Sequence, residues 1–414
     1  MIDSGIRQEF PILSRLIHGM PMTYLDSAST SLKPRCVLQA IRRYYEESTA
    51  NVHRSTHPLG EEATEAYENA RSEVAKFLNA QPDEIVFVRN TTEAINLVAT
   101  GLGLQSDDEV LITPLEHHSN QLPWAAKVHV KYAPLGTNEL PQSTNLDTLL
   151  TPRTRLLALG LLSNVTGTRG DVETWCRAAR DRKLPFLLDA SQAAGHMPID
   201  VNALGCDFLA LSGHKVIGPS GIGVLWGRRE WLARVAPSML GGGMVHHSSL
   251  SAYQVKEPPW CFEAGTPNIE GAVGLAAALT FLAEIGMERV QEHSLALGRQ
   301  LHEGLLPFAD LRLLSSSDQA HYGIVSFVVA VPSLSSETFG RLLADSYGIL
   351  VSAGRHCAQP YHDCLGITST VRASTHVYTT EDEVARFLEA VRELVGPSSA
   401  TGKEICNEAL APVS

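Results

Sequence analysis

Short apolar runs alternate with stretches of helical length through the middle of the chain. Four of these runs cover residues 110–112, 156–159, 186–188 and 208–211. The spacing is typical of βαβ units, whose parallel strands are buried on both faces and therefore read as continuous apolar segments. The pattern predicts an α/β fold with a mostly parallel central sheet and helices on both faces. Ligands bind such sheets beyond the carboxyl ends of the strands.

Polar residues follow each of these runs directly. They are residues 116–120, Ser163-Asn164, residues 189–192 and residues 212–215. We expect the four clusters to converge at one edge of the sheet. The last cluster ends in Lys215, and a lysine between buried strands can have a lowered pKa and attack an aldehyde as an amine nucleophile. The alternative is an ordinary surface lysine in a loop.

A strand, a turn and a helix are predicted upstream of these clusters. Residues 84–88 are apolar and β-branched, and Asn90-Thr91-Thr92-Glu93 has the form of a capping box. The hydroxyls of Thr91 and Thr92 and the free N–H groups of a helix start form an anion site, which phosphate commonly occupies. The alternative is that the threonines only cap the helix.

An amine nucleophile, a phosphate site and an aspartate at one sheet edge together suit pyridoxal 5′-phosphate (PLP). Lys215 would react with the aldehyde, and Asp189 would keep the ring nitrogen protonated. His117 could stack on the ring, while Gln192 and Ser212 could hold the ring oxygen and the phosphate. Each assignment is weak alone, because an aspartate at a strand end is commonly just a helix cap.

Composition narrows the class of protein. The net charge of −12 argues against a nucleic-acid or anionic-membrane surface. The chain starts without a recognisable signal peptide, and its longest nearly apolar run, residues 271–283, is too short to span a bilayer. Its seven cysteines are irregularly spaced and contain no CxxC pair, so neither a disulfide framework nor a metal site is predicted. We expect a cytoplasmic protein.

The length of 414 residues predicts two lobes. Residues 1–21 are assigned to an N-terminal segment that packs with the small domain, and 22–270 to the large cofactor-binding domain. Residues 271–396 form a linking helix and a small α+β domain. The helical region that leads into this domain is expected to bend near Gly286. Residues 397–414 are predicted to be a disordered tail.

Nine motifs carry a family resemblance that covers residues 22 to 395. They are Tyr24 to Ala28, Val88 to Glu93, Glu116 to His118, Ser163 to Val165, Asp189 to Ala193, Ser212 to Lys215, Phe262 to Asn268, Arg355 to Pro360 and Arg372 to Ser374. With these motifs the chain resembles the group II cysteine desulfurases and selenocysteine lyases. Those are PLP enzymes of fold type I, related to class V aminotransferases, with a seven-stranded type of central sheet.

The resemblance implies a role for each matching residue. Lys215 would bind the cofactor aldehyde covalently and move the α-proton, and Cys357 would take sulfur from L-cysteine, leaving L-alanine and a persulfide for a sulfur acceptor. The other implied cofactor contacts are Thr91, Thr92, His117, Asp189, Gln192, Ser212 and His214, with Thr266 reaching the site of the partner in a homodimer. The implied substrate contacts are Ala28, His53, Asn164 and Arg372.

The loop around Cys357 supports a reactive thiol and also departs from the family pattern. Arg355 and His356 are polar neighbours of the kind that lower a thiol pKa. Ser352, however, stands where the family usually has an arginine, and Arg355 stands where it has a histidine. The departures leave a second reading open, a PLP-dependent C–S β-lyase acting on an S-substituted cysteine in a specialised pathway. A scaffold without catalysis conflicts with the intact Lys215, Asp189 and His117.

Overall fold

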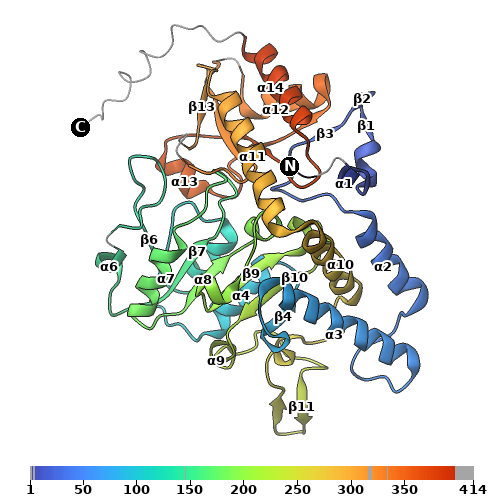
Figure 1. Cartoon of the computed structure of the whole chain (residues 1–414). Helices are drawn as coiled ribbons and strands as arrows, with labels where there is room; N and C mark the ends of the chain where they lie inside the picture. The colour runs from blue at the N-terminus through green and yellow to red at the C-terminus, as the bar shows by residue number, and fades with distance from the viewer. Residues whose placement is uncertain (1, 3–4, 145, 316–318, 333, 397–414) are drawn as a thin grey trace.

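The computed structural model describes the chain except residues 1, 3–4, 145, 316–318, 333 and 397–414. The predicted disordered tail lies outside the described residues. The chain forms a lower lobe around a seven-stranded sheet and an upper lobe around a four-stranded sheet (Figure 1). The division of the chain at about residue 270 stays a prediction.

The seven-stranded sheet has the strand order β4-β10-β9-β8-β7-β5-β6. Its strands are β4 (Ile85–Val88), β5 (Glu109–Ile112), β6 (His129–Tyr132), β7 (Thr154–Gly160), β8 (Phe186–Asp189), β9 (Phe208–Ser212) and β10 (Gly223–Gly227). The five strands from β5 to β9 are parallel, as predicted, whereas β10 runs antiparallel to β9 and β4. The connection from β9 to β10 is too short for the crossover that a parallel pair needs.

Alternate residues of the central strands face two different hydrophobic clusters. Leu209 and Leu211 pack into one cluster, whereas Phe208 and Ala210 pack into the other. This follows from the two-residue period of a strand, and it explains why these strands read as unbroken apolar runs. The edge strand β6 was not predicted, because its residues are only half-buried or exposed and form no such run.

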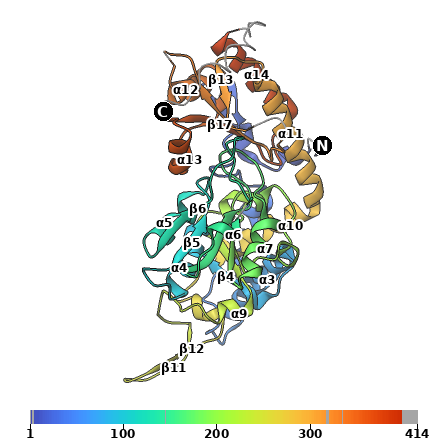
Figure 2. The same ribbon diagram turned by 90° about the vertical axis from the view of Figure 1, so that its left-hand side faces the viewer.

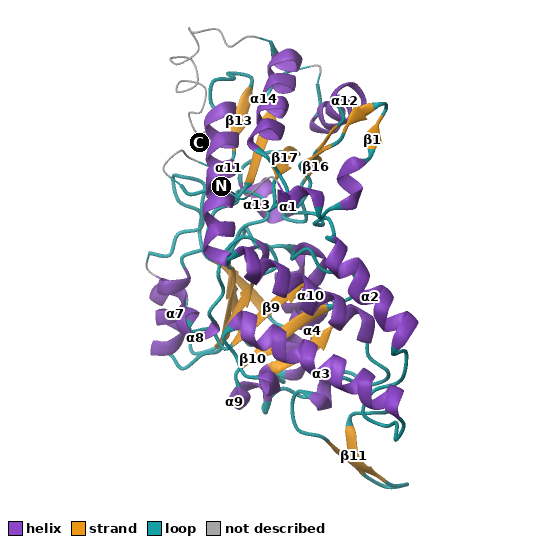
Figure 3. Cartoon of the chain, turned by 45° about the vertical axis from the view of Figure 1, so that its right-hand side comes forward, coloured by secondary structure: helices purple, strands orange, loops and turns teal. Residues whose placement is uncertain are grey.

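Helices cover both faces of this sheet (Figure 3). On one face, α10 (Ile269–Ile285) packs against α2 (Arg35–Glu47) and α3 (Pro58–Leu78), and α4 (Thr91–Gly101) covers the other. The remaining helices of the lower lobe are α5 (Leu122–Ala125), α6 (Leu146–Leu149), α7 (Val172–Asp181), α8 (Val201–Leu204) and α9 (Arg229–Leu232).

The upper lobe contains an antiparallel sheet of order β13-β14-β17-β16. Its strands are β13 (Leu311–Leu313), β14 (Ile324–Val329), β16 (Ser352–Gly354) and β17 (Thr370–Ser374), and its helices are α11 (Met287–Leu305), α12 (Ser336–Tyr347), α13 (Gln359–Cys364) and α14 (Glu381–Val395). The chain bends by 80° between α10 and α11, at Gly286, whose φ of 91° suits glycine. The predicted bend is therefore confirmed.

The start of the chain packs on the upper lobe. Arg7, in α1 (Gly5–Gln8), forms a 2.8 Å ion pair with Glu383, and the ring of Phe10 lies 4.7 Å from that of Tyr378. Three strand pairs lie outside the main sheets: β1 (Leu16–Ile17) with β2 (Met20–Pro21), β3 (Thr23–Tyr24) with β15 (Ile349–Leu350), and β11 (Val245–Ser248) with β12 (Tyr253–Val255). The β11–β12 hairpin projects from the lower lobe (Figure 2).

Among the described helices, none is by itself both long enough and apolar enough to cross a membrane. The bent pair α10 and α11 together passes the same test of length and composition.

Candidate active site

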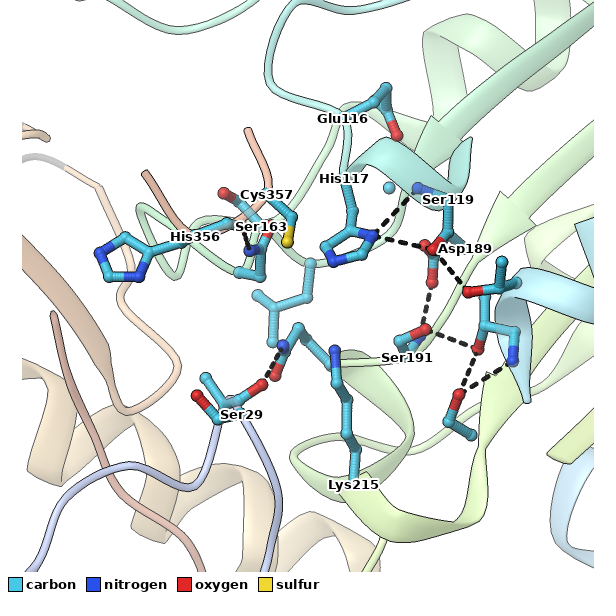
Figure 4. Close-up of a pocket in the computed structure, with 18 of the residues that line it drawn as sticks. Ser29, Glu116, His117, Ser119, Ser163, Asp189, Ser191, Lys215, His356 and Cys357 are labelled. Atoms are coloured by element: carbon cyan, nitrogen blue, oxygen red, sulfur yellow. Dashed lines mark hydrogen bonds between the residues drawn. The ribbon is translucent and has the colours of Figure 1, made fainter. Parts of the chain in front are cut away.

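A cavity of about 450 Å³ lies at the carboxyl ends of the parallel strands. The structure brings most of the predicted site residues into its wall: Ala28, Thr91, Thr92, His117, Asn164, Asp189, Gln192, Ser212, His214, Lys215, Cys357 and Arg372. The four polar clusters that follow the strands therefore converge, as expected. Figure 4 shows Lys215 and Cys357 entering this cavity from different sides.

Lys215 ends a short 3₁₀ turn, Gly213–Lys215, directly after β9. Its amine lies deep in the protein and makes no hydrogen bond or ion pair with any residue that the structure describes. Burial lowers the pKa of this amine to about 8, although the charge of Asp189 opposes the shift. About a tenth of the amine is therefore unprotonated at pH 7, far more than for an ordinary lysine, and this is the form that attacks an aldehyde.

The imidazole of His117 is neutral and has a defined tautomer. Its Nδ1 accepts a 3.1 Å hydrogen bond from the backbone N–H of Ser119, so the ring proton is on Nε2. Burial lowers the pKa of His117 to about 4, and the charge of Lys215 lowers it further. The ring offers a flat, uncharged surface at the cavity wall. Asp189 accepts a 2.9 Å bond from the N–H of Ser191 at the end of β8.

Hydroxyl groups gather at the first turn of α4. The Thr91 hydroxyl lies 2.7 Å from that of Ser191 and 2.8 Å from that of Ser212, and Thr92 lies 2.7 Å from Ser119. Hydroxyls and N–H groups at a helix start bind phosphate well. The capping box is only half correct, because Asn90 accepts from the N–H of Glu93 while the Glu93 carboxylate accepts from the N–H of Arg89.

Arg372, on β17, is buried with one nitrogen unsatisfied. One terminal nitrogen donates to the carbonyl of Asn164 at 2.9 Å, and the other donates to the Ser29 hydroxyl at 2.8 Å. Its Nε finds no partner within the described part of the chain. Burial lowers the pKa of this guanidinium. A buried donor without a partner next to a cavity fits an incoming carboxylate.

Cys357 is exposed to solvent, and its loop has unusual backbone angles. His356 and Cys357 have φ values of 50° and 56°, a left-handed conformation that is costly for two successive residues other than glycine. Two contacts hold the loop in place. The amide of Asn164 donates to the carbonyl of His356 at 2.7 Å, and the N–H of His118 donates to the carbonyl of Cys357 at 2.9 Å.

The electrostatic role expected for Arg355 and His356 at the Cys357 thiol stays a prediction, and both side chains have other surroundings in the structure. Arg355 donates to the carbonyl of Thr368 and pairs with Asp363, each at 2.9 Å, so its charge is already engaged. Burial lowers the pKa of His356 to about 2, so this ring is neutral. Two other cationic side chains, those of Lys215 and Arg372, line the same cavity as Cys357.

Two predicted site residues lie elsewhere. His53 and Thr266 line a second pocket of about 170 Å³, together with Arg54, Lys256 and Glu263. The ring of His53 lies 2.8 Å from the carboxylate of Glu68, and Thr266 is exposed. Neither residue reaches the cavity of its own chain, so the roles predicted for them stay predictions that require a second subunit.

The cavity wall also includes residues that sequence reasoning did not assign. Ser29 holds Arg372, while Ser119 and Ser191 join the hydroxyl cluster. The two latter serines lie inside the polar clusters that follow the strands, which was a usable signal. Glu116 is buried in the cavity wall, and burial raises its pKa to about 7. Ser352, at the position of the missing arginine, lines the cavity from β16.

Comparisons with known proteins agree with this geometry. Residues 23–387 match the family model described as aminotransferase class-V. A probable cysteine desulfurase from Streptomyces coelicolor is 42% identical over 410 residues, which cover 95% of this chain and 97% of that protein. The apo structure of the cysteine desulfurase from Thermococcus onnurineus NA1 has a TM-score of 0.89 at 38% identity and covers 95% of this chain and 98% of its own.

The cysteine desulfurase CsdA from Escherichia coli is also similar, with a TM-score of 0.86 at 38% identity over 96% of this chain and all of that chain. The cavity fits the PLP that this family uses. It combines a buried amine that has no partner among the described residues, a hydroxyl cluster at a helix start, a neutral ring and a carboxylate. The chain belongs to the class-V aminotransferase family and, within it, to the PLP-dependent cysteine desulfurases.

Proposed function

We propose that this protein converts L-cysteine to L-alanine and collects the sulfur as a persulfide on Cys357, from which it passes to a sulfur acceptor. The observation that carries this proposal is the placement of an exposed thiol at the cavity that holds Lys215. When bound, PLP supplies an electron sink that weakens bonds at the α- and β-carbons of an amino acid.

The residues of the chain divide the remaining work. Lys215 holds the cofactor through its amine and afterwards moves the proton at the α-carbon of the substrate. Arg372 orients the substrate carboxylate, which can accept from its unsatisfied Nε. The hydroxyls of Thr91, Thr92 and Ser212 hold the cofactor phosphate, with His214 beside them. The other assigned contacts, Gln192 to the ring oxygen and Ala28 near the substrate, stay proposals.

Cys357 performs the sulfur transfer. Its thiolate attacks the sulfur of the bound cysteine, so that an S–S bond forms and the bond from carbon to sulfur breaks. The β-carbon of the substrate then gains a proton, so that the product is alanine. The enzyme keeps the sulfur as Cys–S–SH. Atoms balance without any added oxidant or reductant.

The β-lyase alternative is less well supported. A lyase would release pyruvate and ammonia, and its reaction would not use the Cys357 thiol. The fold nevertheless holds Cys357 in a strained conformation beside the cavity. Cysteine desulfurases are 38% to 42% identical to this chain, whereas the cystine C-S lyase C-DES, which has a similar fold, is 25% identical. Product analysis with L-cysteine tests the proposal directly. Equal amounts of alanine and persulfide sulfur support it, whereas pyruvate and ammonia as the main products contradict it.

We also propose that the active protein is a homodimer. Thr266 is exposed in a second pocket with His53, away from its own chain's cavity, and could complete the phosphate site of a partner. The exposed side chain of Cys357 leaves the persulfide accessible to the thiol of an acceptor protein. A cytoplasmic location suits this chemistry, because a catalytic thiol needs a reducing compartment.

A further inference from the structure

The turn that carries Lys215 is held by hydrogen bonds from other parts of the chain. The carbonyl of His214 accepts bonds from the N–H of Ser31 at 2.9 Å and from the amine of Lys33 at 3.1 Å. The next carbonyl, that of Lys215 itself, lies 3.3 Å from Nε2 of His376. His376 comes from the segment after β17, in the upper lobe of the molecule. The backbone of the reactive lysine is therefore tied to both lobes.

Hydrogen bonding fixes the form of the His376 ring. Its Nδ1 accepts a 2.9 Å bond from the N–H of Val377, so the ring proton must be on Nε2, where it is donated to the carbonyl of Lys215. Only a neutral imidazole satisfies both contacts. Burial lowers the pKa of His376 well below its usual value, and the neighbouring ring of His196 lowers it further. The ring also stacks on Tyr378, with centroids 5.4 Å apart.

A glycine makes room for this contact. A Cβ on Gly195 would lie 2.8 Å from Nε2 of His376 and 2.8 Å from the carbonyl oxygen of Lys215. Real Cβ atoms do not approach other atoms so closely, so a side chain at this position would push the two groups apart. The lack of a side chain at Gly195 is therefore a condition for the hydrogen bond between His376 and Lys215.

We propose that His376 is a positioning residue for Lys215, which fixes the turn so that the amine points into the cavity at a constant depth. This inference rests on the proposed attachment of PLP to Lys215. His376 does not touch the amine directly. The charged or titratable groups that act on the amine are Asp189, Arg372 and Cys357. Those that act on His376 are His196, Lys33 and His293.

The test uses three substitutions in the full-length protein. His376→Leu removes the donor, whereas His376→Gln keeps an N–H group near the position of Nε2. The matched control is His302→Leu. His302 is also buried, and its Nε2 lies 3.1 Å from a backbone carbonyl, that of Ser315, in the upper lobe. Both leucine variants lose one comparable buried hydrogen bond and should have similarly lowered melting temperatures. Of the two histidines, only His376 contacts Lys215.

The readout is the pH profile of PLP attachment to protein from which the cofactor has been removed. Attachment needs the unprotonated amine, so the rate at which visible absorption returns should be half-maximal near pH 8 in the wild type. In His376→Leu the loosened turn admits water to the amine, so we expect the midpoint to rise by about half a pH unit or more. We also expect kcat to fall roughly 10-fold with KM almost unchanged. His376→Gln and His302→Leu should keep the wild-type profile.

Gly195→Ala provides a second route to the same effect, since its methyl group separates the bonded atoms. It should reproduce the shifted pH profile. In the double variant with His376→Leu, the shift of the midpoint should be much smaller than the sum of the two single shifts. The inference is overturned by an unchanged profile in His376→Leu, by an equal shift in His302→Leu, or by full additivity. If wild-type Lys215 takes up no PLP, the proposed function fails and the inference fails with it. PLP uptake with an unchanged variant profile refutes the inference alone.

Discussion

The side-chain amide of Asn164 donates a 2.7 Å hydrogen bond to the backbone carbonyl of His356. Asn164 follows β7 of the large sheet, and His356 precedes Cys357 in the upper lobe. The bond therefore ties the edge of the sheet to the loop that carries the reactive thiol. The resemblance to the family implied that this amide grips the substrate carboxylate, but in the structure it already has a partner within the chain.

Asn164→Ala should release the Cys357 loop while leaving the PLP contacts intact. We expect alanine formation to fall roughly 10-fold or more, because a half-buried carbonyl loses its partner and the strained loop can relax. The deciding measurement is the rate at which iodoacetamide alkylates Cys357 in the absence of substrate. A clamp changes this rate, whereas a residue that only binds the substrate carboxylate leaves it unchanged and raises KM.

Cys357→Ala should keep the cofactor and still bind L-cysteine, as followed by visible absorption, yet yield almost no alanine or persulfide. The chain offers a matched control in Cys364, an exposed cysteine at the end of α13 that lies outside the cavity wall. Cys364→Ala should retain nearly full turnover. Normal turnover of L-cysteine by Cys357→Ala would leave the β-lyase as the better description.

Reduction with borohydride should fix the cofactor to the peptide that contains Lys215, and Lys215→Ala should retain little activity. Lys33 is a stringent comparison, because burial lowers the pKa of its amine to about 8 as well. Its amine is engaged by the carbonyls of Ser31 and His214, and it does not line the cavity. Peptide mapping by mass spectrometry reads the result, and cofactor found on Lys33 would overturn the assignment.

Mixing Lys215→Ala subunits with Thr266→Ala subunits tests whether two chains share each site. If Thr266 acts in the partner's cavity, one site of every mixed dimer carries both changes and the other carries neither. Random reassociation should then restore about a quarter of wild-type activity from two nearly inactive parents. A mixture no more active than its parents would show that Thr266 acts elsewhere.

Glu116 should make the stability of the protein depend on pH. Burial raises its pKa from 4.5 to about 7, so the folded protein holds this proton more tightly than the unfolded chain. The associated stability is fully present below about pH 4.5 and is lost as the pH rises through 7, with a total on the order of 3 kcal/mol. In Glu116→Gln this loss should be absent, so denaturant unfolding at pH 5 and pH 8 should differ less than in the wild type.

Local sequence determined much of the architecture and the chemistry of the cavity wall around Lys215 and Asp189. Strands buried on both faces appear as continuous apolar runs, so β5, β7, β8 and β9 could be predicted, together with the polar clusters that follow them. Lys215 and Asp189 could be assigned because parallel strands bring their carboxyl ends to one edge. The helix after the Asn90 cap was predictable for the same local reason, and α4 begins at Thr91.

Only the tertiary structure decided the electrostatic surroundings of each group. Arg355 lies two residues before Cys357 in the sequence, yet its charge is paired with Asp363, while Lys215 and Arg372 line the same cavity as the thiol. Coulomb energies and desolvation depend on distances in space and on burial, which no run of neighbouring residues encodes. The contact between His376 and Lys215 is of the same kind, because it joins residues 161 positions apart through a space that Gly195 leaves open.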